Sequence, residues 1–494
     1  MSNQLSMEMN RSASPAPVAR LSTLSRLSIG LAVIIVGLLI YRSFTAEPAH
    51  HAAHHGPPPI LAVAPFVGIL LSIAILPLVP ATHHWWENNH NKLAVSLAFA
   101  AATLVYYLFV GGVEQVVTIL DHAILWEYIP FIVLLFSLYA ISGGISLSGD
   151  LAAHPTTNTA FLGIGALIAS FIGTTGASML LIRPLLQTNS ERKHVVHTVI
   201  FFIFLVSNIG GSLLPVGDPP LFLGYLKGVP FLWTLGLWKP WLFCCVILLG
   251  IYFVWDTLAY RRELKRDILK DETQRAPLVL RGTINMGWLA GVVLAAALID
   301  PSKNLPLIGV KPFPFLRELV MLAFVGLSLR TTPGGVREAN KFNYVAILEV
   351  AALFIGIFIA MQVPIEILNA RGASLGLERP WQFFWATGAL SSFLDNAPTY
   401  VVFFETANAM THSPGPGILQ LLSDHFIRVD LLVAISLGAV FMGANTYIGN
   451  GPNFMVKSIA EQSGVKMPSF FGYMLYSVVI LVPLFLVVTL VFLR

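Results

Sequence analysis

Ionisable side chains are scarce within the long apolar stretches of this sequence, and three of them are candidates for chemistry. Asp218 and Asp395 lie where glycine and proline interrupt such a stretch, whereas Glu349 lies in the middle of an unbroken one. A charged side chain at membrane depth costs roughly 2.5–3.5 kcal/mol even on the lenient insertion scale, so it requires water, a partner or a function. Asp395, next to the amide of Asn396, is the first candidate for holding a cation or carrying a proton. Glu349 is a second candidate proton carrier.

Each acidic residue also has a structural explanation. Asp395 fits a helix cap at the tip of a hairpin, and this role can coexist with ligand binding. Asp218 precedes two prolines and fits turn or cap chemistry, and Glu349 fits an ion pair between helices. Glu405 and Arg183 lie on the far arms of two interrupted stretches, where boundary positions are expected.

Glycine and proline interrupt four apolar stretches, in two matched pairs. The interruptions are Gly173-Thr174-Thr175-Gly176, Gly210-Gly211 with Gly217-Asp218-Pro219-Pro220, Ser392 to Pro398, and Gly443-Ala444-Asn445 with Gly449-Asn450-Gly451-Pro452. Broken backbone inside hydrocarbon is costly unless protein or water satisfies its polar groups. Helix N-termini at such breaks attract anions, while unwound carbonyls attract cations. One break is ordinarily a kink, but two matched pairs predict a transport site near the membrane midplane.

The composition excludes a soluble enzyme. Of the 494 residues, 56% are hydrophobic and 11% charged, whereas soluble proteins carry about 25% charged residues. Many apolar runs reach the ~20 residues that span a membrane. No G-x-x-x-x-G-K-[ST] loop is present, which argues against transport driven by the chain's own ATP hydrolysis. An intramembrane enzyme is the alternative from another class, but H-E-x-x-H and similar patterns are missing.

The order of the stretches predicts an all-α polytopic membrane protein with about 11 transmembrane helices. Residues 60–260 and 282–494 are expected to form two inverted repeats, each with a re-entrant hairpin and a broken helix, joined by a basic loop at 261–281. Continuous spans are expected near 60–80, 93–112, 128–147, 237–259, 282–300, 315–330, 342–362 and 470–493. The hairpins lie near 160–182 and 381–408, and the broken helices lie from about 194 and at 429–458.

Basic residues set the expected orientation, because excess Lys and Arg remain in the cytoplasm. We expect a bacterial-type inner (plasma) membrane protein. If the loop at 261–281 lies on the cytoplasmic side, the other basic clusters fall on that side too. Those residues are Arg183, Arg192, Lys193, Arg330, Arg337 and Lys341. The two halves then have opposite orientation, as in many secondary transporters. The equal spacing of Gly211–Gly217 and Gly443–Gly449 agrees with this repeat.

The N-terminal segment stands apart from the repeats. Residues 1–26 are expected to be a cytoplasmic polar tail and residues 27–44 a signal anchor or signal peptide. The linker at 45–59 contains His50, His51, His54 and His55. These histidines favour a solvated linker over a metal site, because no cysteine or carboxylate framework accompanies them. Cys244 and Cys245 are adjacent in an apolar run and are expected to be small buried hydrophobes. No cofactor is expected.

The interrupted segments resemble the ion transporter superfamily. The segments are Ser207-Asn208-Ile209-Gly210-Gly211, then Gly217-Asp218-Pro219-Pro220, and downstream Phe393-Leu394-Asp395-Asn396-Ala397-Pro398. That superfamily includes NhaD-type sodium/proton antiporters, arsenical pumps, pink-eyed-dilution type proteins, and citrate and dicarboxylate transporters. The resemblance covers roughly residues 60–494. It implies a scaffold part and a transport part in each half, elevator-type movement, and often a homodimer.

The resemblance also implies a set of substrate- and ion-binding residues between the hairpin tips and the broken helices. From one half these are Thr174, Thr175, Gly176, Ser178, Asn208 and Asp218, and from the other Asp395, Asn396, Thr399, Asn445, Thr446 and Asn450. Na⁺ and H⁺ are the implied transported or coupling ions.

The hairpin tips guide the choice of substrate. The dicarboxylate branch typically has Ser-Asn-Thr at both tips, and this signature is missing here. An acidic residue at the second tip would repel a carboxylate unless a cation lay between them, and no obvious membrane-embedded Arg or Lys is placed to neutralise a tricarboxylate. The Asp-Asn-x-Pro form resembles the antiporters and arsenical pumps. The resemblance therefore favours sodium (or other monovalent cation)/proton antiport, with proton- or sodium-coupled symport of citrate, free or metal-bound, as the alternative, followed by arsenite efflux.

Overall fold

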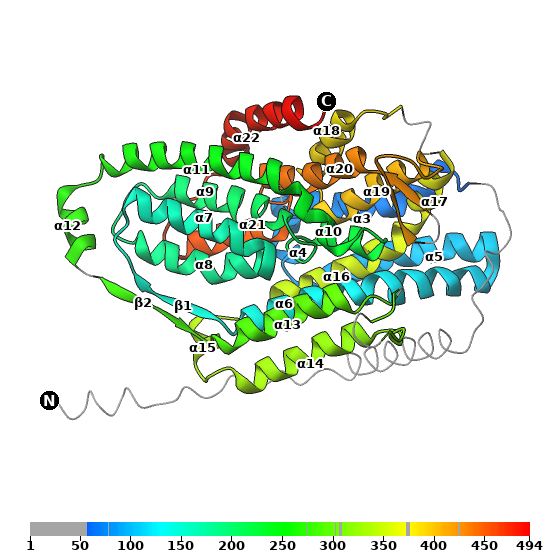
Figure 1. Cartoon of the computed structure of the whole chain (residues 1–494), viewed down its shortest axis with the longest axis horizontal. Helices are drawn as coiled ribbons and strands as arrows, with labels where there is room; N and C mark the ends of the chain where they lie inside the picture. The colour runs from blue at the N-terminus through cyan, green and yellow to red at the C-terminus, as the bar shows by residue number, and fades with distance from the viewer. Residues whose placement is uncertain are drawn as a thin grey trace. The chain divides into compact units, whose positions relative to one another are not determined.

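The computed structural model describes residues 57–494 except 78, 274, 302, 306–308, 372–375 and 423–424. The predicted polar tail, signal anchor and histidine pairs lie outside the described residues. The described part is largely helical, in agreement with the prediction (Figure 1).

The first helices precede the first interrupted stretch. They are η1 (Ile60–Val63), α3 (Ala64–Ile75), α4 (Pro80–Trp86), α5 (Asn89–Leu120), the π-helix η2 (Asp121–Tyr128) and α6 (Ile129–Ser142). Helical structure therefore continues through residues 113–127, where the sequence predicted a gap between two spans. A break does occur within α5, because Gly112 adopts φ 70° and ψ −166°. This conformation is costly for any residue with a side chain.

The first predicted hairpin and broken helix follow. They comprise α7 (Pro155–Ile172), α8 (Thr174–Thr188), α9 (Val196–Leu205), η3 (Ile209–Ser212), α10 (Pro219–Leu226), η4 (Phe231–Leu237) and α11 (Trp238–Tyr260). Helix α7 contacts α8, α9 and α11 (Figure 1). The hairpin turns at Gly173, whose φ of 80° suits glycine.

The segment between the halves is not a plain loop. It contains α12 (Lys265–Thr273) and β2 (Ala276–Arg281), and β2 pairs antiparallel with β1 (Ser146–Asp150). The carboxylate of Asp271 in α12 accepts hydrogen bonds from the backbone N–H of Ala153 at 3.0 and 3.2 Å. These contacts hold the basic segment against the end of the α6–α7 connection.

The second half contains the remaining elements. They are α13 (Ile284–Leu298), α14 (Leu316–Thr331), α15 (Val336–Ala339), α16 (Val345–Ala360), α17 (Gln362–Arg371), α18 (Pro380–Ser391), α19 (Asn396–Ala409), β3 (Ile418–Gln420), β4 (Phe426–Arg428), α20 (Val429–Met442), η7 (Gly443–Asn445), α21 (Gly451–Gln462) and α22 (Phe470–Phe492). The β3–β4 hairpin and the β1–β2 pair make the fold largely rather than entirely α-helical.

Among the described residues, four helical stretches are long and apolar enough to cross a membrane, or up to six if each bent pair is one span. The expected number of about 11 also includes the N-terminal anchor, which lies outside the described residues. The four are Asn89–Ser142, Pro155–Ile172, Phe231–Tyr260 and Phe470–Phe492. The bent pairs are α3 with α4, and α16 with α17, the latter bent by 41°. Breaks explain much of the difference, because the apolar stretches Val196–Ser212 and Val429–Asn445 end at the predicted interruptions, and Ile284–Leu298 is short.

Equivalent hydrogen bonds occur at the two interrupted regions. Ser170 lies four residues before the start of α8, and Ser392 four residues before the start of α19. The Ser170 hydroxyl donates to the Gly210 carbonyl, and the Ser392 hydroxyl donates to the Met442 carbonyl. Gly210 and Met442 each lie eight residues before the N-cap of the next helix. Each hairpin is thus tied to its broken helix at a matching position.

The equally spaced glycines have a packing explanation. A Cβ atom at Gly217 would clash with the carbonyl oxygen of Gly211, and one at Gly449 would clash with that of Gly443. The backbone therefore closes on itself at both breaks, and only glycine permits this approach.

Candidate functional site

Four helix N-termini meet around one carboxylate. Helix α8 begins at Thr174, α19 begins at Asn396, and α10 and α21 have Asp218 and Asn450 as their N-caps. The Asp218 Oδ1 atom accepts from Thr174 Oγ1 at 3.0 Å and from Asn450 Nδ2 at 3.2 Å, and Oδ2 accepts from Asn396 Nδ2 at 2.6 Å. Asp218 is 1% exposed. Both hairpins and both broken helices therefore share this contact.

Electrostatics account for a buried carboxylate at this place. The N-terminus of a helix carries a partial positive charge of about 0.5, and backbone N–H groups at helix starts bind anions. The ion pairs of the described residues include neither Asp218 nor Asp395. Helix dipoles and neutral donors, rather than a lysine or arginine, thus offset the Asp218 charge. The sequence also suggested that the Asp218 side chain caps a helix. This is wrong, because Asp218 is the N-cap residue of α10 but its side chain makes no hydrogen bond to that helix.

Asp395 is the more accessible carboxylate. Its Oδ1 atom accepts from the backbone N–H of Ala397 at 3.1 Å, so the predicted cap of α19 is confirmed. The side chain is half-buried, and no hydrogen bond to its Oδ2 atom is formed among the described residues. Thr399 Oγ1 donates to the Asp395 carbonyl at 3.0 Å and holds the same turn. One carboxylate oxygen is therefore left for another ligand.

Two amide oxygens of residues at the second hairpin tip and the second break are buried without a partner. Asn396 uses its Nδ2 atom for Asp218, and Asn445 donates its Nδ2 to Ser392 Oγ at 2.9 Å. Their Oδ1 atoms have no hydrogen-bond partner. Most buried polar atoms in proteins have a hydrogen-bond partner, so these two oxygens indicate a place where a cation or a hydrogen-bond donor can bind. The described residues contain no group of three or more His, Cys, Asp or Glu side chains placed to hold a metal. A cation here would have one carboxylate and neutral oxygens as ligands.

The remaining predicted residues of the broken helices join the same network. Asn208 Oδ1 accepts from Asn450 Nδ2 at 3.3 Å, and its Nδ2 donates to Asn453 Oδ1 at 2.7 Å. Thr446 donates to the Ser392 carbonyl and accepts from the N–H of Gly449 at 3.1 Å. These bonds satisfy the unwound backbone beside the second hairpin tip.

At the first tip, the predicted residues differ in their contacts. Ser178 and Ser207 share a hydrogen bond of 2.9 Å between their hydroxyls. Gly176 faces Ser142, which a Cβ atom would approach closely. Thr175 is half-buried and makes no side-chain hydrogen bond with the described residues.

Glu349 belongs to a different contact. Its Oε1 atom lies 2.6 Å from the Nζ atom of Lys92, which is 5% exposed, while the Glu349 side chain is 41% exposed. The ion pair joins α16 to α5, the structural explanation weighed from sequence.

Two interactions were missed from sequence. Asn453 donates its Nδ2 to the carbonyls of Gly443 and Thr446, at 2.8 and 2.9 Å. Lys227 lies 2.7 Å from Glu405 and 3.1 Å from Glu127, measured from Nζ to Oε1. Glu405 is 6% exposed and is paired with Lys227, an interaction that the expectation of a boundary position did not include. The matching spacing of Lys227 from Asp218 and of Glu405 from Asn396, nine residues in each case, was the available signal.

Interrupted apolar helices that converge on a buried polar network, in a chain with several candidate membrane spans, define a multi-pass membrane transporter. A family model described as "Putative citrate transport" matches residues 56–493, and the chain belongs to that family. The family is part of the ion transporter superfamily, so the resemblance at that level is confirmed. Membership places the chain among transporters rather than enzymes. No curated protein matches the chain. The family favours the citrate alternative over sodium/proton antiport, the first expectation.

Proposed function

We propose that this protein is a secondary transporter that moves citrate, or a closely related carboxylate, together with a cation held at the second hairpin tip. The observation that carries this proposal is the pair of unpartnered buried oxygens at the second hairpin tip. One is Oδ1 of Asn396, which follows Asp395, and the other is Oδ1 of Asn445, which is hydrogen-bonded to Ser392, three residues before Asp395. A bound Na⁺, or a proton on Asp395, would satisfy this group. Unwound segments coordinate coupling ions in this way in secondary transporters.

The cation also answers the objection to a carboxylate substrate. Asp395 alone would repel citrate, whereas Asp395 with a bound cation presents a neutral or positive surface. The four helix N-termini around Asp218 add a field that favours anions. Cation and carboxylate can therefore bind in adjacent positions, and binding of one favours the other.

The matched contacts support an inverted-repeat plan for the transport mechanism. The pairs Ser170–Gly210 and Ser392–Met442, and the clashes that require Gly217 and Gly449, occur at equivalent positions. We propose two inverted repeats over 60–260 and 282–494 that bring the site to alternate sides of the membrane by an elevator-type movement. The homodimer and the cytoplasmic placement of the 261–281 segment belong to the same proposal, from the superfamily resemblance and the positive-inside rule.

Purified protein in liposomes tests the proposal. Labelled citrate is supplied outside, with inward gradients of Na⁺ or H⁺ imposed separately, each with and without Mg²⁺. Citrate accumulation that requires one gradient, and is lost in Asp395→Asn, is the expected result. Sodium-induced proton movement without citrate uptake would instead identify a sodium/proton antiporter and refute the citrate proposal.

A further inference from the structure

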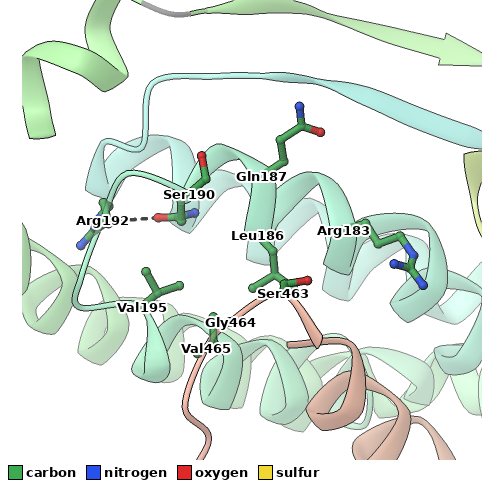
Figure 2. A pocket seen from close by; sticks show the side chains of 10 residues that line it. Arg183, Leu186, Gln187, Ser190, Arg192, Val195, Ser463, Gly464 and Val465 are labelled. Carbon is green, nitrogen blue, oxygen red and sulfur yellow. Dashed lines mark hydrogen bonds between the residues drawn. The ribbon is translucent and has the colours of Figure 1, made fainter. Parts of the chain in front are cut away.

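A second polar pocket lies between the ends of α8 and α21 that point away from Asp218. It has a volume of about 330 Å³, and its lining includes Arg183, Gln187, Ser190, Arg192 and Ser463. Figure 2 shows Arg183 and Arg192 at opposite ends of this lining, with Ser463 and Gly464 between them. Arg183 lies nine residues beyond Thr174, which is about 13 Å along a helix. The pocket is therefore separate from the central site.

The charge of Arg183 is uncompensated among the described residues. Its side chain is half-buried and takes part in none of their ion pairs or hydrogen bonds. Arg192 differs, because its guanidinium binds Asp256 with N–O distances of 2.6 and 3.1 Å. The Nε atom of Arg192 is nevertheless buried without a hydrogen-bond acceptor, although Glu263 lies 3.9 Å away. Arg192 is therefore engaged by two carboxylates, and Arg183 is the arginine of this lining that has no ion-pair partner among the described residues.

Glu405 occupies the position in the second half that is equivalent to Arg183, and it has a charged partner. Arg183 and Glu405 each lie nine residues after the first residue of their helices, α8 and α19. Glu405 is paired with Lys227 at the end of α10. The position of α21 that corresponds to Lys227, nine residues after the N-cap Asn450, is Ile459. Lys227 therefore balances the charge of Glu405. At the position where Arg183 would need a partner, the chain has the apolar Ile459, and Arg183 lines a pocket.

We propose that this pocket binds a small oxyanion, with Arg183 as the charged anchor. A guanidinium binds carboxylate or phosphate through paired N–H groups, and a volume near the lower end of the ~300–1,000 Å³ range of ligand pockets suits a small anion. The two sources of that chemistry are the carboxylate substrate, in which case the inference rests on the proposed function, and a free inorganic anion such as phosphate. As a substrate subsite, the pocket would hold citrate on its way to or from the central site.

Binding to the purified full-length chain tests the inference, with citrate and inorganic phosphate titrated separately by calorimetry. The variants are Arg183→Gln, and Ser463→Glu, which adds a negative charge at an exposed lining position. The control is Arg330→Gln, which removes an exposed arginine outside the pocket. We expect at least tenfold weaker binding of one anion in both pocket variants and wild-type binding in the control. Arg183→Lys, which keeps the charge, should retain most of the affinity.

The outcomes separate this inference from the proposed function. Citrate binding that depends on Arg183 supports a substrate subsite, and phosphate binding that depends on Arg183 supports an inorganic anion site even if citrate is not transported. Citrate transport and binding of both anions that are unchanged in both pocket variants would overturn the inference and leave the proposed function intact. Absence of binding for both anions in the wild type would also overturn it.

Discussion

The Nδ2 atom of Asn396 lies 2.6 Å from the Oδ2 atom of Asp218, although 178 residues separate them in the sequence. This bond joins the tip of the second hairpin to the break of the first broken helix. A hydrogen bond to a charged group contributes about 1.5–3 kcal/mol. The two halves of the chain are thus coupled at the residue where the four helix starts meet.

The network around Asp218 predicts different effects for two adjacent threonines. Thr174→Ala removes the bond from Thr174 Oγ1 to Asp218 and should lower the free energy of unfolding by about 1.5–3 kcal/mol. Thr175→Ala is the matched control, because the Thr175 side chain makes no hydrogen bond with the described residues, and a change within about 0.5 kcal/mol is expected. Denaturant unfolding in detergent measures both. Equal stability of the two variants would contradict the role given to Thr174.

The cap and ligand roles of Asp395 can be separated by two substitutions. Asparagine is as good an N-cap as aspartate, so Asp395→Asn should keep the stability of α19 within about 0.5 kcal/mol, while Asp395→Ala should cost about 1 kcal/mol. Both should abolish cation-driven uptake, because neither retains the carboxylate. Thermal unfolding and liposome uptake are measured on the same preparations. Coupled uptake that survives in Asp395→Asn would limit Asp395 to a cap.

The unpartnered oxygen of Asn445 predicts a change in ion affinity. Asn445→Ala removes this oxygen and the bond to Ser392 Oγ, which is worth roughly 1 kcal/mol. The concentration of the coupling cation that gives half-maximal citrate uptake should rise about tenfold or more, with little change in the maximal rate at saturating cation. Ser392→Ala is the control, because it removes the same Asn445 bond and keeps the oxygen. It also removes the bond from Ser392 to the Met442 carbonyl, so the stability of both variants is measured alongside. A similar rise in both variants would assign the effect to packing.

The ion pairs of Lys227 with two buried glutamates predict a large loss of stability when the lysine charge is removed. Lys227→Met leaves Glu127 and Glu405 without their cation, and breaking a buried ion pair in this way costs about 3–5 kcal/mol. Adding Glu405→Gln and Glu127→Gln to the same chain should restore much of the loss, because no uncompensated charge remains. Unfolding of the single and triple variants tests this. A triple variant as unstable as the single one would show that the lysine stem, not its charge, matters.

The sequence predicted much of the site but little of its connectivity. Glycine, proline and acidic residues located the breaks at Gly173, Gly217, Asp395 and Gly449, because only these residue types interrupt apolar helices at tolerable cost. Which break contacts which depends on packing between distant segments, and no local signal places Asn396 on Asp218. The same holds for Lys227, whose partners lie 100 and 178 residues away.

The substrate was the least predictable part, for a physical reason. The sequence offered Asp395 as a bare negative charge, which argued for a cation as substrate. The structure adds the unpartnered oxygens of Asn396 and Asn445 and the four helix starts around Asp218, from which we propose adjacent binding of a cation and a carboxylate. Hydrogen-bond satisfaction and helix direction are three-dimensional properties, and neither is visible in the residue types alone.

The pairing of β1 with β2 also constrains how the helices between these two strands can be displaced. Residues 151–275, which include α7 to α11, leave and re-enter the rest of the chain through two strands held together by hydrogen bonds. Gly149, with φ 138° and no room for a side chain against Pro277, lies at this junction. Both ends of this segment are therefore attached to the rest of the chain at a single place, the β1–β2 pair. Its covalent connections permit rotation about that junction, whereas translation requires the two strands to separate or to travel with it.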